Sequence, residues 1–335
     1  MNDVKPRVGI TIGDPAGVGP EIVVKALWNP APYAEVRPVV YADGCVLAAA
    51  AAGKGLALRE IASPAEARCQ HGTIDYIDPH TLTEPIPLGV ISAAGGRAGF
   101  ACLARAIDAA LAGEIDAVAT APLNKESLRA AAVPYLDHTA ALADLAGRTE
   151  PMTLFLVRNL KIFFLTRHIR LSDVPAAVTS EAILEAVPYC LAYLRQLGAE
   201  EPTLAVAALN PHGGEQGLFG TEERDIIAPA VAEAQHRGYR VYGPIPADSV
   251  FHQALEGRYA GVLSLYHDQG HIAAKTLDFH GTVSLTMGLK FLRTSVDHGT
   301  AFDIAGRGIA DPCGMVTAIR AAGRYALGVK ERPIV

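Results

Sequence analysis

The feature that most constrains this fold is a repeated alternation of short apolar runs with Ala- and Leu-rich segments of helical periodicity. Runs rich in β-branched residues predict strands at 7–12, 38–41, 116–120, 204–209 and 261–265. Apolar residues three or four positions apart predict helices at 18–28, 45–52, 99–112 and 222–237. Strands that alternate with helices form right-handed βαβ units, so we expect a mostly parallel sheet with helices on both faces. A chain of 335 residues favours two domains or one large α/β unit.

One segment departs from this alternation. Two strand-like runs, 152–157 and 161–166, are separated only by Arg158, Asn159 and Leu160. Such spacing predicts a β-hairpin. A hairpin within an α/β chain often belongs to a second domain or to an arm between subunits.

Charge and composition exclude several classes of protein. The formal net charge is −6, so no overall positive field attracts nucleic acid, and an anionic substrate must be met by locally placed cations. We find no charged-then-apolar signal segment at the N-terminus and no apolar run of membrane-spanning length. The five cysteines are widely spaced and none forms a C-x-x-C pair, which is typical of reduced thiols. We therefore expect a cytoplasmic protein that binds neither nucleic acid nor membranes.

Three histidines directly follow predicted strands: His168 after KIFFLTR, His212 after LAVAALNP and His267 after GVLSLY. A single histidine at a strand end is ordinarily a hydrogen-bonded core or surface residue. Three in equivalent positions could converge, and imidazole nitrogens suit Zn²⁺ and related ions, with a coordination position left for substrate. No local metal-binding motif connects them, so the pattern alone leaves both interpretations open.

Cations and glycine-rich turns lie at other strand ends. Lys125 follows Asn124, which could cap a helix. Lys275 and Arg293 either are solvated side chains or bind a phosphate or carboxylate group of the substrate. The turn GDPAGVGPE at 13–21 lacks the spacing of a dinucleotide fingerprint and shows only a tight strand-to-helix connection. The Gly- and Asp-rich segment 296–311 is either a nucleotide-binding loop or a plain surface loop.

Taken together, these segments resemble one known family. GDPAGVGPE, APLNKE, LDHTA, NPHGGEQGLFGTEE, ADSVF, YHDQGHI and FLRTSVDHGTAFDIAGRG are similar, in order and spacing, to the motifs of the 4-hydroxythreonine-4-phosphate dehydrogenase family. The resemblance implies a two-domain α/β/α fold like that of isocitrate and isopropylmalate dehydrogenases, with the active site in the interdomain cleft. It implies a cofactor-side domain of residues 1–130 plus 280–335. The central domain, 131–279, would carry the metal ligands and the contacts of a homodimer with shared active sites.

The resemblance also implies roles for single residues. The metal ligands would be His168, His212 and His267, holding one divalent ion such as Zn, Mg, Mn or Co. The substrate would contact His138, Thr139, Lys275, Ser284 and Arg293. Lys275, Asp248 and Asp268 are the candidate catalytic groups, and His298, Gly299 and Asp303 would contact NAD or NADP.

The implied reaction is the metal- and NAD(P)-dependent oxidation, with decarboxylation, of a 4-phosphorylated 3-hydroxy acid. Within the family, TAPLNKE, GLFG, YHDQGHI and AFDIA are more similar to the branch acting on D-threonate or D-erythronate 4-phosphate than to the pyridoxine-biosynthesis enzymes. The family's usual asparagine, in a G-V-N-[IV]-T stretch, is replaced by Ser284. A more distant branch, which oxidises a dihydrodiol dicarboxylate, also departs there, but the presence of Lys275 and Arg293 argues against it.

Two other classes of function stay open. A metal-dependent aldolase or isomerase of sugar phosphates would use the same histidines and cations without a nicotinamide. A non-catalytic nucleotide-binding regulator would keep the sheet and lose the metal.

Overall fold

The computed structural model describes residues 5–135, 138–147 and 151–332, except the side chains of 138–140. The chain divides into two compact units. Unit 1 comprises Met1–Pro151 and Val283–Lys330, and unit 2 comprises Met152–Thr282 and Glu331–Val335. The boundary between the units lies after Pro151, later in the chain than the predicted boundary after residue 130. The predicted domains were 1–130 plus 280–335 and 131–279.

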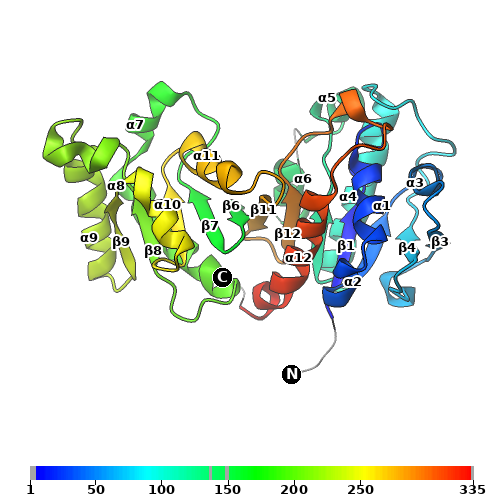
Figure 1. The fold of residues 1–335 in the computed structure, drawn as a ribbon, viewed down its shortest axis with the longest axis horizontal. Helices are drawn as coiled ribbons and strands as arrows, with labels where there is room; N and C mark the ends of the chain where they lie inside the picture. The colour runs from blue at the N-terminus through cyan, green and yellow to red at the C-terminus, as the bar shows by residue number, and fades with distance from the viewer. Residues whose placement is uncertain (1–4, 136–137, 148–150, 333–335) are drawn as a thin grey trace. The chain divides into compact units, whose positions relative to one another are not determined.

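Unit 1 is built on a mostly parallel sheet whose strands lie in the order β3-β4-β2-β1-β5-β12-β11. All neighbouring strands are parallel except β11, which runs antiparallel to β12. The strands are β1 (Arg7–Thr11), β2 (Arg37–Tyr41), β3 (Ala57–Glu60), β4 (Thr73–Ile77), β5 (Ala117–Thr120), β11 (Val283–Met287) and β12 (Leu292–Val296). The helices are α1 (Gly19–Trp28), α2 (Ala31–Glu35), α3 (Gly44–Ala51), α4 (Ala93–Leu111), α5 (Lys125–Ala130), α6 (His138–Leu145) and α12 (Cys313–Glu331). Two short 3-10 turns, η1 (Pro64–Glu66) and η5 (Phe302–Ile304), complete the unit, whose main helices and strands are labelled in Figure 1.

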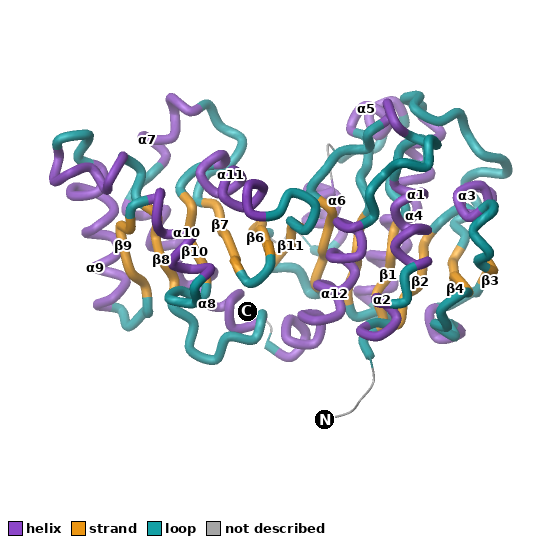
Figure 2. Tube along the Cα trace, viewed as in Figure 1, coloured by secondary structure: helices purple, strands orange, loops and turns teal. Residues whose placement is uncertain are grey.

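Unit 2 contains a smaller sheet in the order β6-β7-β10-β8-β9 (Figure 2). The strands are β6 (Met152–Val157), β7 (Leu160–Phe164), β8 (Leu204–Ala207), β9 (Val241–Ile245) and β10 (Gly261–Ser264). β6 and β7 pair antiparallel, which confirms the predicted hairpin, and the other pairs are parallel. The helices are α7 (Val174–Ala177), α8 (Ser180–Gln196), α9 (Ala228–His236), α10 (Ala247–Leu255) and α11 (His267–Leu277). Short helical turns η2 (Leu171–Asp173), η3 (Pro211–Gly217) and η4 (Glu223–Ile227) lie between them.

Two predicted helices differ from the observed ones for identifiable reasons. α4 begins at Ala93, earlier than the predicted residue 99, because Ser92 caps it by accepting a hydrogen bond from Gly95 N. A Cβ on Gly96 would lie 2.0 Å from Ser127 O, so the glycine permits close packing of α4 on α5. The predicted helix 222–237 opens with the π-helical turn η4, and Pro229 in the first turn of α9 cannot donate a backbone hydrogen bond.

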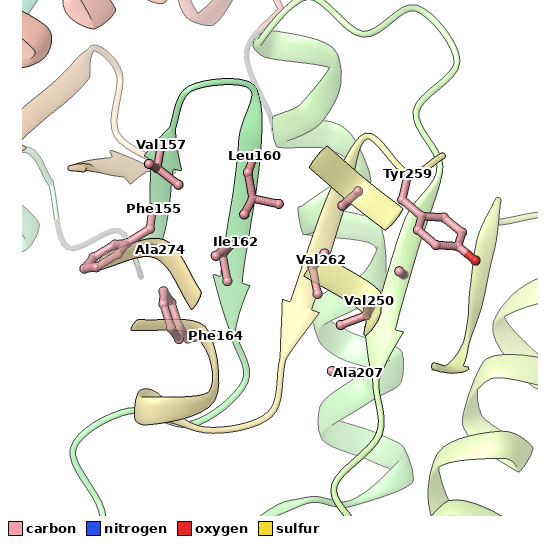
Figure 3. Close-up of a cluster of buried hydrophobic side chains, with 12 residues drawn as sticks. Phe155, Val157, Leu160, Ile162, Phe164, Ala207, Val250, Tyr259, Val262 and Ala274 are labelled. Carbon is pink, nitrogen blue, oxygen red and sulfur yellow. The ribbon is translucent and has the colours of Figure 1, made fainter. Parts of the chain in front are cut away.

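One cluster of the unit 2 core lies between its sheet and the helices α10 and α11. Leu160, Ile162 and Phe164 alternate along β7 and therefore point to the same face, where they join Val250 and Ala274 (Figure 3). A Cβ on Gly270 would lie 2.5 Å from the Phe164 ring, so only glycine fits where α11 crosses β7. This packing fixes α11, which begins at His267.

In the described part of the chain, no helix combines the length and apolar character that crossing a membrane requires. Cys102 and Cys190 are buried thiols.

Candidate active site

The three candidate histidines lie beyond the carboxyl ends of three adjacent strands of unit 2. β10 pairs in parallel with β7 on one side and with β8 on the other. His168 follows β7, His267 follows β10 and His212 follows β8. Because the carboxyl ends of parallel strands meet at one edge of a sheet, all three histidines follow the same edge of the unit 2 sheet.

His267 is held by two neighbours on its own helix. Its Nδ1 lies 2.6 Å from Asp268 Oδ1, and its ring stacks on that of His271 with centroids 3.6 Å apart. His271 in turn packs between Phe155 and Phe164. A carboxylate at Nδ1 fixes the ring and leaves Nε2 as the nitrogen suited to a metal. His271 was not predicted from the sequence, although its i,i+4 spacing from His267 on one helix was the available signal.

His212 lies in a turn of unusual backbone. Residues 212–216 all have positive φ, including the non-glycine residues His212, Glu215 and Gln216. Each non-glycine residue in this region costs roughly 1–2 kcal/mol, so the surrounding structure must hold the turn in place. His212 Nδ1 lies 3.2 Å from Glu215 Oε1, which again leaves Nε2 exposed for a ligand.

A buried carboxylate that was not predicted from the sequence, Glu223, holds the turn before His212. Glu223 is 5% exposed and accepts hydrogen bonds from the backbone N–H groups of Leu209 and Asn210 and from the Asn210 side chain. Asn210 also donates to Glu222, and backbone hydrogen bonds together with this contact lower the pKa of the Glu222 carboxyl. The repeated acidic pair in GTEE was the only sequence signal for this support.

Gln269 links the ends of β8 and β10. Its Oε1 accepts from Leu265 N at 2.8 Å and from Ser264 Oγ at 3.1 Å, and its Nε2 donates to Ala208 O at 2.8 Å. The strand ends that precede His212 and His267 are therefore tied through one buried amide.

The donor chemistry of the three histidines fits a divalent metal, because two rings have carboxylates at Nδ1 and imidazoles suit such ions. The rings of His168 and His267 lie 5.8 Å apart. Among the described residues of one chain, no three His, Cys, Asp or Glu side chains meet closely enough to hold a metal ion.

The other candidate groups of unit 2 lie on α10 and α11. Asp248 and Asp268 line a hollow of about 650 Å³ between the two helices. Lys275 lies in the last turn of α11, with its Nζ 5.1 Å from the centre of the Phe279 ring. Lys275 is thus on the same helical face as His267 and His271, one turn beyond His271.

In unit 1, Arg293 lies at the centre of a buried cluster of hydroxyl groups. Its Nε and Nη2 donate to Thr120 Oγ1 at 3.0 and 2.7 Å, and its Nη1 donates to Thr286 Oγ1 at 3.2 Å. Ser284 lies opposite Ser295 in the β11–β12 ladder, two residues from the Thr286–Arg293 pair and therefore on the same face. Arg293 is 6% exposed, and the two threonine hydroxyls hold its guanidinium in place. Thr120 and Thr286 were not predicted.

His138 and Thr139 are the first residues of α6, and their side chains lie outside the described part of the structure. Asn124 caps α5 through a hydrogen bond from Ser127 N, as predicted, while Lys125 is exposed.

The three cofactor candidates lie on one exposed loop. His298 Nδ1 lies 2.9 Å from Gly299 O, and Asp303 belongs to η5. The loop is fixed to the glycine-rich turn because Val18 N donates to Thr300 O at 2.9 Å. A Cβ on Gly17 would lie 2.8 Å from that carbonyl, so the glycine permits the contact.

Known proteins resemble this chain along nearly its whole length. The family model described as pyridoxal phosphate biosynthetic protein PdxA matches residues 34–322. A protein of Symbiobacterium thermophilum named "Putative D-threonate 4-phosphate dehydrogenase" is 51% identical over 98% of this chain and 99% of its own.

Solved structures agree with this relationship. A 4-hydroxythreonine-4-phosphate dehydrogenase from Klebsiella pneumoniae superimposes with a TM-score of 0.88 at 41% identity, covering 97% of this chain and 99% of its own. A terephthalate 1,2-cis-dihydrodiol dehydrogenase from Burkholderia xenovorans is more distant, with a TM-score of 0.64 at 30% identity over 95% of this chain and 98% of its own. The chain therefore belongs to the PdxA family of dehydrogenases.

Proposed function

We propose that this enzyme oxidises D-threonate 4-phosphate or D-erythronate 4-phosphate with NAD or NADP, and that the product loses CO₂. The observation that carries the substrate choice is the buried cluster around Arg293, in which Ser284 lies on the same face as the guanidinium. Serine offers one hydroxyl where an asparagine would offer two N–H donors and a carbonyl acceptor. The relatives named for D-threonate 4-phosphate support the same substrate class.

The residues of unit 1 would bind the anionic substrate. Arg293 is held by two threonine hydroxyls, so its guanidinium is oriented before the substrate arrives. A planar guanidinium suits bidentate recognition of a phosphate or carboxylate. His138 and Thr139 would supply further contacts to the phosphate and carboxylate groups, and Lys275 is the substrate-binding candidate of unit 2.

The residues of unit 2 would hold a divalent metal through His168, His212 and His267. When bound, this ion would draw electron density from the substrate's C3 oxygen, and the nicotinamide would accept the hydride from C3. Asp268 orients His267, and Asp248, Asp268 or Lys275 would move the hydroxyl proton. In this assignment unit 1 is the cofactor side and unit 2 carries the metal ligands, as the sequence-based domains were expected to do.

We further propose a cytoplasmic homodimer whose active sites are shared. Shared active sites are what the resemblance to the 4-hydroxythreonine-4-phosphate dehydrogenase family implies. The hollow between α10 and α11 is lined largely by apolar side chains, and Ile272 beside Asp268 is 64% exposed. Apolar surfaces of this kind are typical of subunit interfaces. Sedimentation should show a dimer, and an active monomer at working concentration would contradict this assignment.

The deciding experiment measures kcat/KM at 340 nm for D-threonate 4-phosphate, D-erythronate 4-phosphate and 4-phosphohydroxy-L-threonine. We expect the wild type to prefer a sugar-acid phosphate. Ser284→Asn should shift preference towards the amino-acid phosphate by about ten- to a hundredfold, the cost of one unmatched buried polar group. A wild type that prefers the amino-acid phosphate, with no change in the variant, would overturn the substrate choice. Absence of reduced cofactor with all three compounds would favour an aldolase, an isomerase or a regulator.

The metal is tested separately. Chelation should abolish turnover, and His212→Ala should lose bound metal while leaving the fold intact, because an exposed truncation changes stability by only about 0.5 kcal/mol. An alanine variant with full metal content and activity would contradict the assignment.

A further inference from the structure

The turn that carries His212 is left-handed over six consecutive residues, 212–217. Their φ angles are 52°, 73°, 79°, 46°, 56° and 104°, although His212, Glu215 and Gln216 are not glycine. L-amino acids enter this region mostly as single residues, because the side chain approaches the following carbonyl oxygen. A run of this length therefore persists only where the surrounding structure holds it.

Hydrogen bonds along the turn do not explain its hand. Gly213 N donates to Asn210 O at 3.1 Å, and Leu218 N donates to Glu215 O at 3.3 Å. Bonds that span three residues also form in right-handed 3-10 turns. The conformation must therefore be selected by a contact from outside the turn.

Glu223 makes that contact on both sides of His212. Its Oε1 accepts from Leu209 N at 2.8 Å and from Asn210 N at 2.6 Å, and its Oε2 accepts from Asn210 Nδ2 at 2.9 Å. Gly214 is buried against the same carboxylate, because a Cβ there would lie 2.7 Å from Glu223 Oε2. The carboxylate thus contacts the chain two residues before and two residues after His212.

Glu223 itself is held in place. It is the first residue of the π-helical turn η4, and π-helical turns occur frequently at functional sites. The turn is tied to α8, because Ser180 Oγ donates to Ile226 O at 3.1 Å. Glu223 is buried, and a buried carboxylate is stable only when its oxygens are hydrogen-bonded, as they are here.

We propose that Glu223 is a positioning residue for the metal site, which rests on the assignment of His212 as a metal ligand. Glu223 holds the left-handed turn, and with it the imidazole of His212, in the binding conformation before a divalent ion arrives. Without this contact the turn populates other conformations, and the metal affinity falls in proportion to the fraction that remains competent.

The first test is calorimetric titration of the purified protein with Co²⁺. In Glu223→Gln an amide N–H₂ replaces the oxygen that accepts from Asn210 Nδ2, and turning the Asn210 amide over would set its oxygen against the Glu222 carboxylate. We expect this variant to bind Co²⁺ at least about tenfold more weakly than wild type. Asp225→Asn is the control for lost charge, since this exposed carboxylate of η4 bonds to Arg224 and should change affinity by no more than about twofold.

A pair of glycine variants tests the contact without changing any charge. Gly213 and Gly214 have similar positive φ, so alanine strains the backbone comparably at either position. A Cβ at Gly213 meets only Pro246 Cγ, at 3.9 Å, whereas a Cβ at Gly214 overlaps Glu223. Gly214→Ala should therefore bind Co²⁺ about tenfold more weakly than Gly213→Ala.

The Co²⁺ absorption spectrum separates positioning from a purely structural role. At saturating Co²⁺ the visible bands of Glu223→Gln should shift towards those of His212→Ala, while urea denaturation shows that each variant is folded during the titration. Wild-type affinity and spectrum in Glu223→Gln, with metal lost in His212→Ala, would overturn the proposal. If Glu223→Gln does not fold, the glycine pair decides, and equal affinities in that pair would also overturn it. The proposed function fails separately, when His212→Ala itself keeps the wild-type metal affinity.

Discussion

The imidazole of His271 stacks on that of His267 one helical turn away, with ring centroids 3.6 Å apart and planes inclined by 12°. His271 Nδ1 also lies 2.8 Å from His267 O, and Phe155 and Phe164 enclose the ring from the sheet side. His271 therefore connects the hydrophobic core of unit 2 to a candidate metal ligand. We infer that His271 positions His267.

We expect His271→Ala to weaken Zn²⁺ or Mn²⁺ binding by about tenfold or more, because loss of a group that orients a ligand typically has this effect. His271→Phe keeps an aromatic ring against His267 and should lose less. The measurement is calorimetric metal titration, with the exposed His236→Ala as control. Equal metal affinity in His271→Ala and wild type would remove the positioning role.

Gln269→Leu should lower the free energy of unfolding by at least about 2 kcal/mol. The substitution leaves Leu265 N and Ala208 O without their buried partner, at about 1–3 kcal/mol for each unsatisfied group. Urea denaturation followed by circular dichroism measures the change. Gln253→Leu on α10, whose contacts are more exposed, should change stability by no more than about 0.5 kcal/mol. Similar effects of the two substitutions would contradict the linking role of Gln269.

Gly270→Ala should destabilise unit 2 by about 1–3 kcal/mol although alanine is the better helix former, because the added Cβ overlaps the Phe164 ring. Gly299→Ala is the control for stability, since a Cβ there meets no atom within 4 Å. Thermal unfolding of both variants provides the comparison. A Gly270→Ala protein as stable as wild type would show that α11 can shift away from β7.

Arg293→Lys should reduce kcat/KM by about a hundredfold while the positive charge is kept. Lysine cannot donate to Thr120 and Thr286 and face the substrate together, as the planar guanidinium can. Thr286→Val, which removes one of the two supporting hydroxyls, should cost about tenfold or less. Steady-state kinetics with the preferred phosphorylated acid separates the two. A lysine variant with near-normal kcat/KM would mean that Arg293 serves only the fold.

Asp14, in the glycine-rich turn, gives a prediction about pH. Burial raises the pKa of its carboxyl above the ordinary 3.8, although the carboxylate accepts a hydrogen bond from Ala16 N. A carboxyl whose pKa is raised by folding contributes stability below its unfolded pKa, and this contribution is lost as pH rises through the folded pKa. Asp14→Asn keeps an oxygen acceptor and does not ionise. The stability of the variant relative to wild type should therefore increase as pH rises above about 4 and then become constant.

Urea denaturation of wild type and Asp14→Asn across this pH range provides the measurement. The titration of all other carboxyls cancels in the difference between their free energies of unfolding. A stability difference that does not change with pH would mean that Asp14 has the same pKa in the folded and unfolded protein.

The sequence determined the central strands and the class of fold. Strands such as 204–207 and 261–264 are buried along their whole length, so they appear as continuous apolar runs that a single sequence reveals. β3 escaped prediction because it is half-exposed, and β12 because Arg293, Thr294 and Ser295 interrupt its apolar pattern. Polar residues in a buried strand therefore make the strand hard to predict from the sequence, and in β12 one of them, Arg293, is a candidate site residue.

The sequence by itself also placed three histidines after three strands and a hydroxyl residue where the family usually has asparagine. Only the tertiary structure brought Thr120 to Arg293 and Gln269 to Ala208. It also brought Glu21 to the backbone N–H of Ala310. Periodicity and capping arise from interactions within a few residues, and these can be predicted from local sequence. Contacts such as Lys25 with Gly308 depend on strand order and on the crossover of distant segments, which local sequence does not encode.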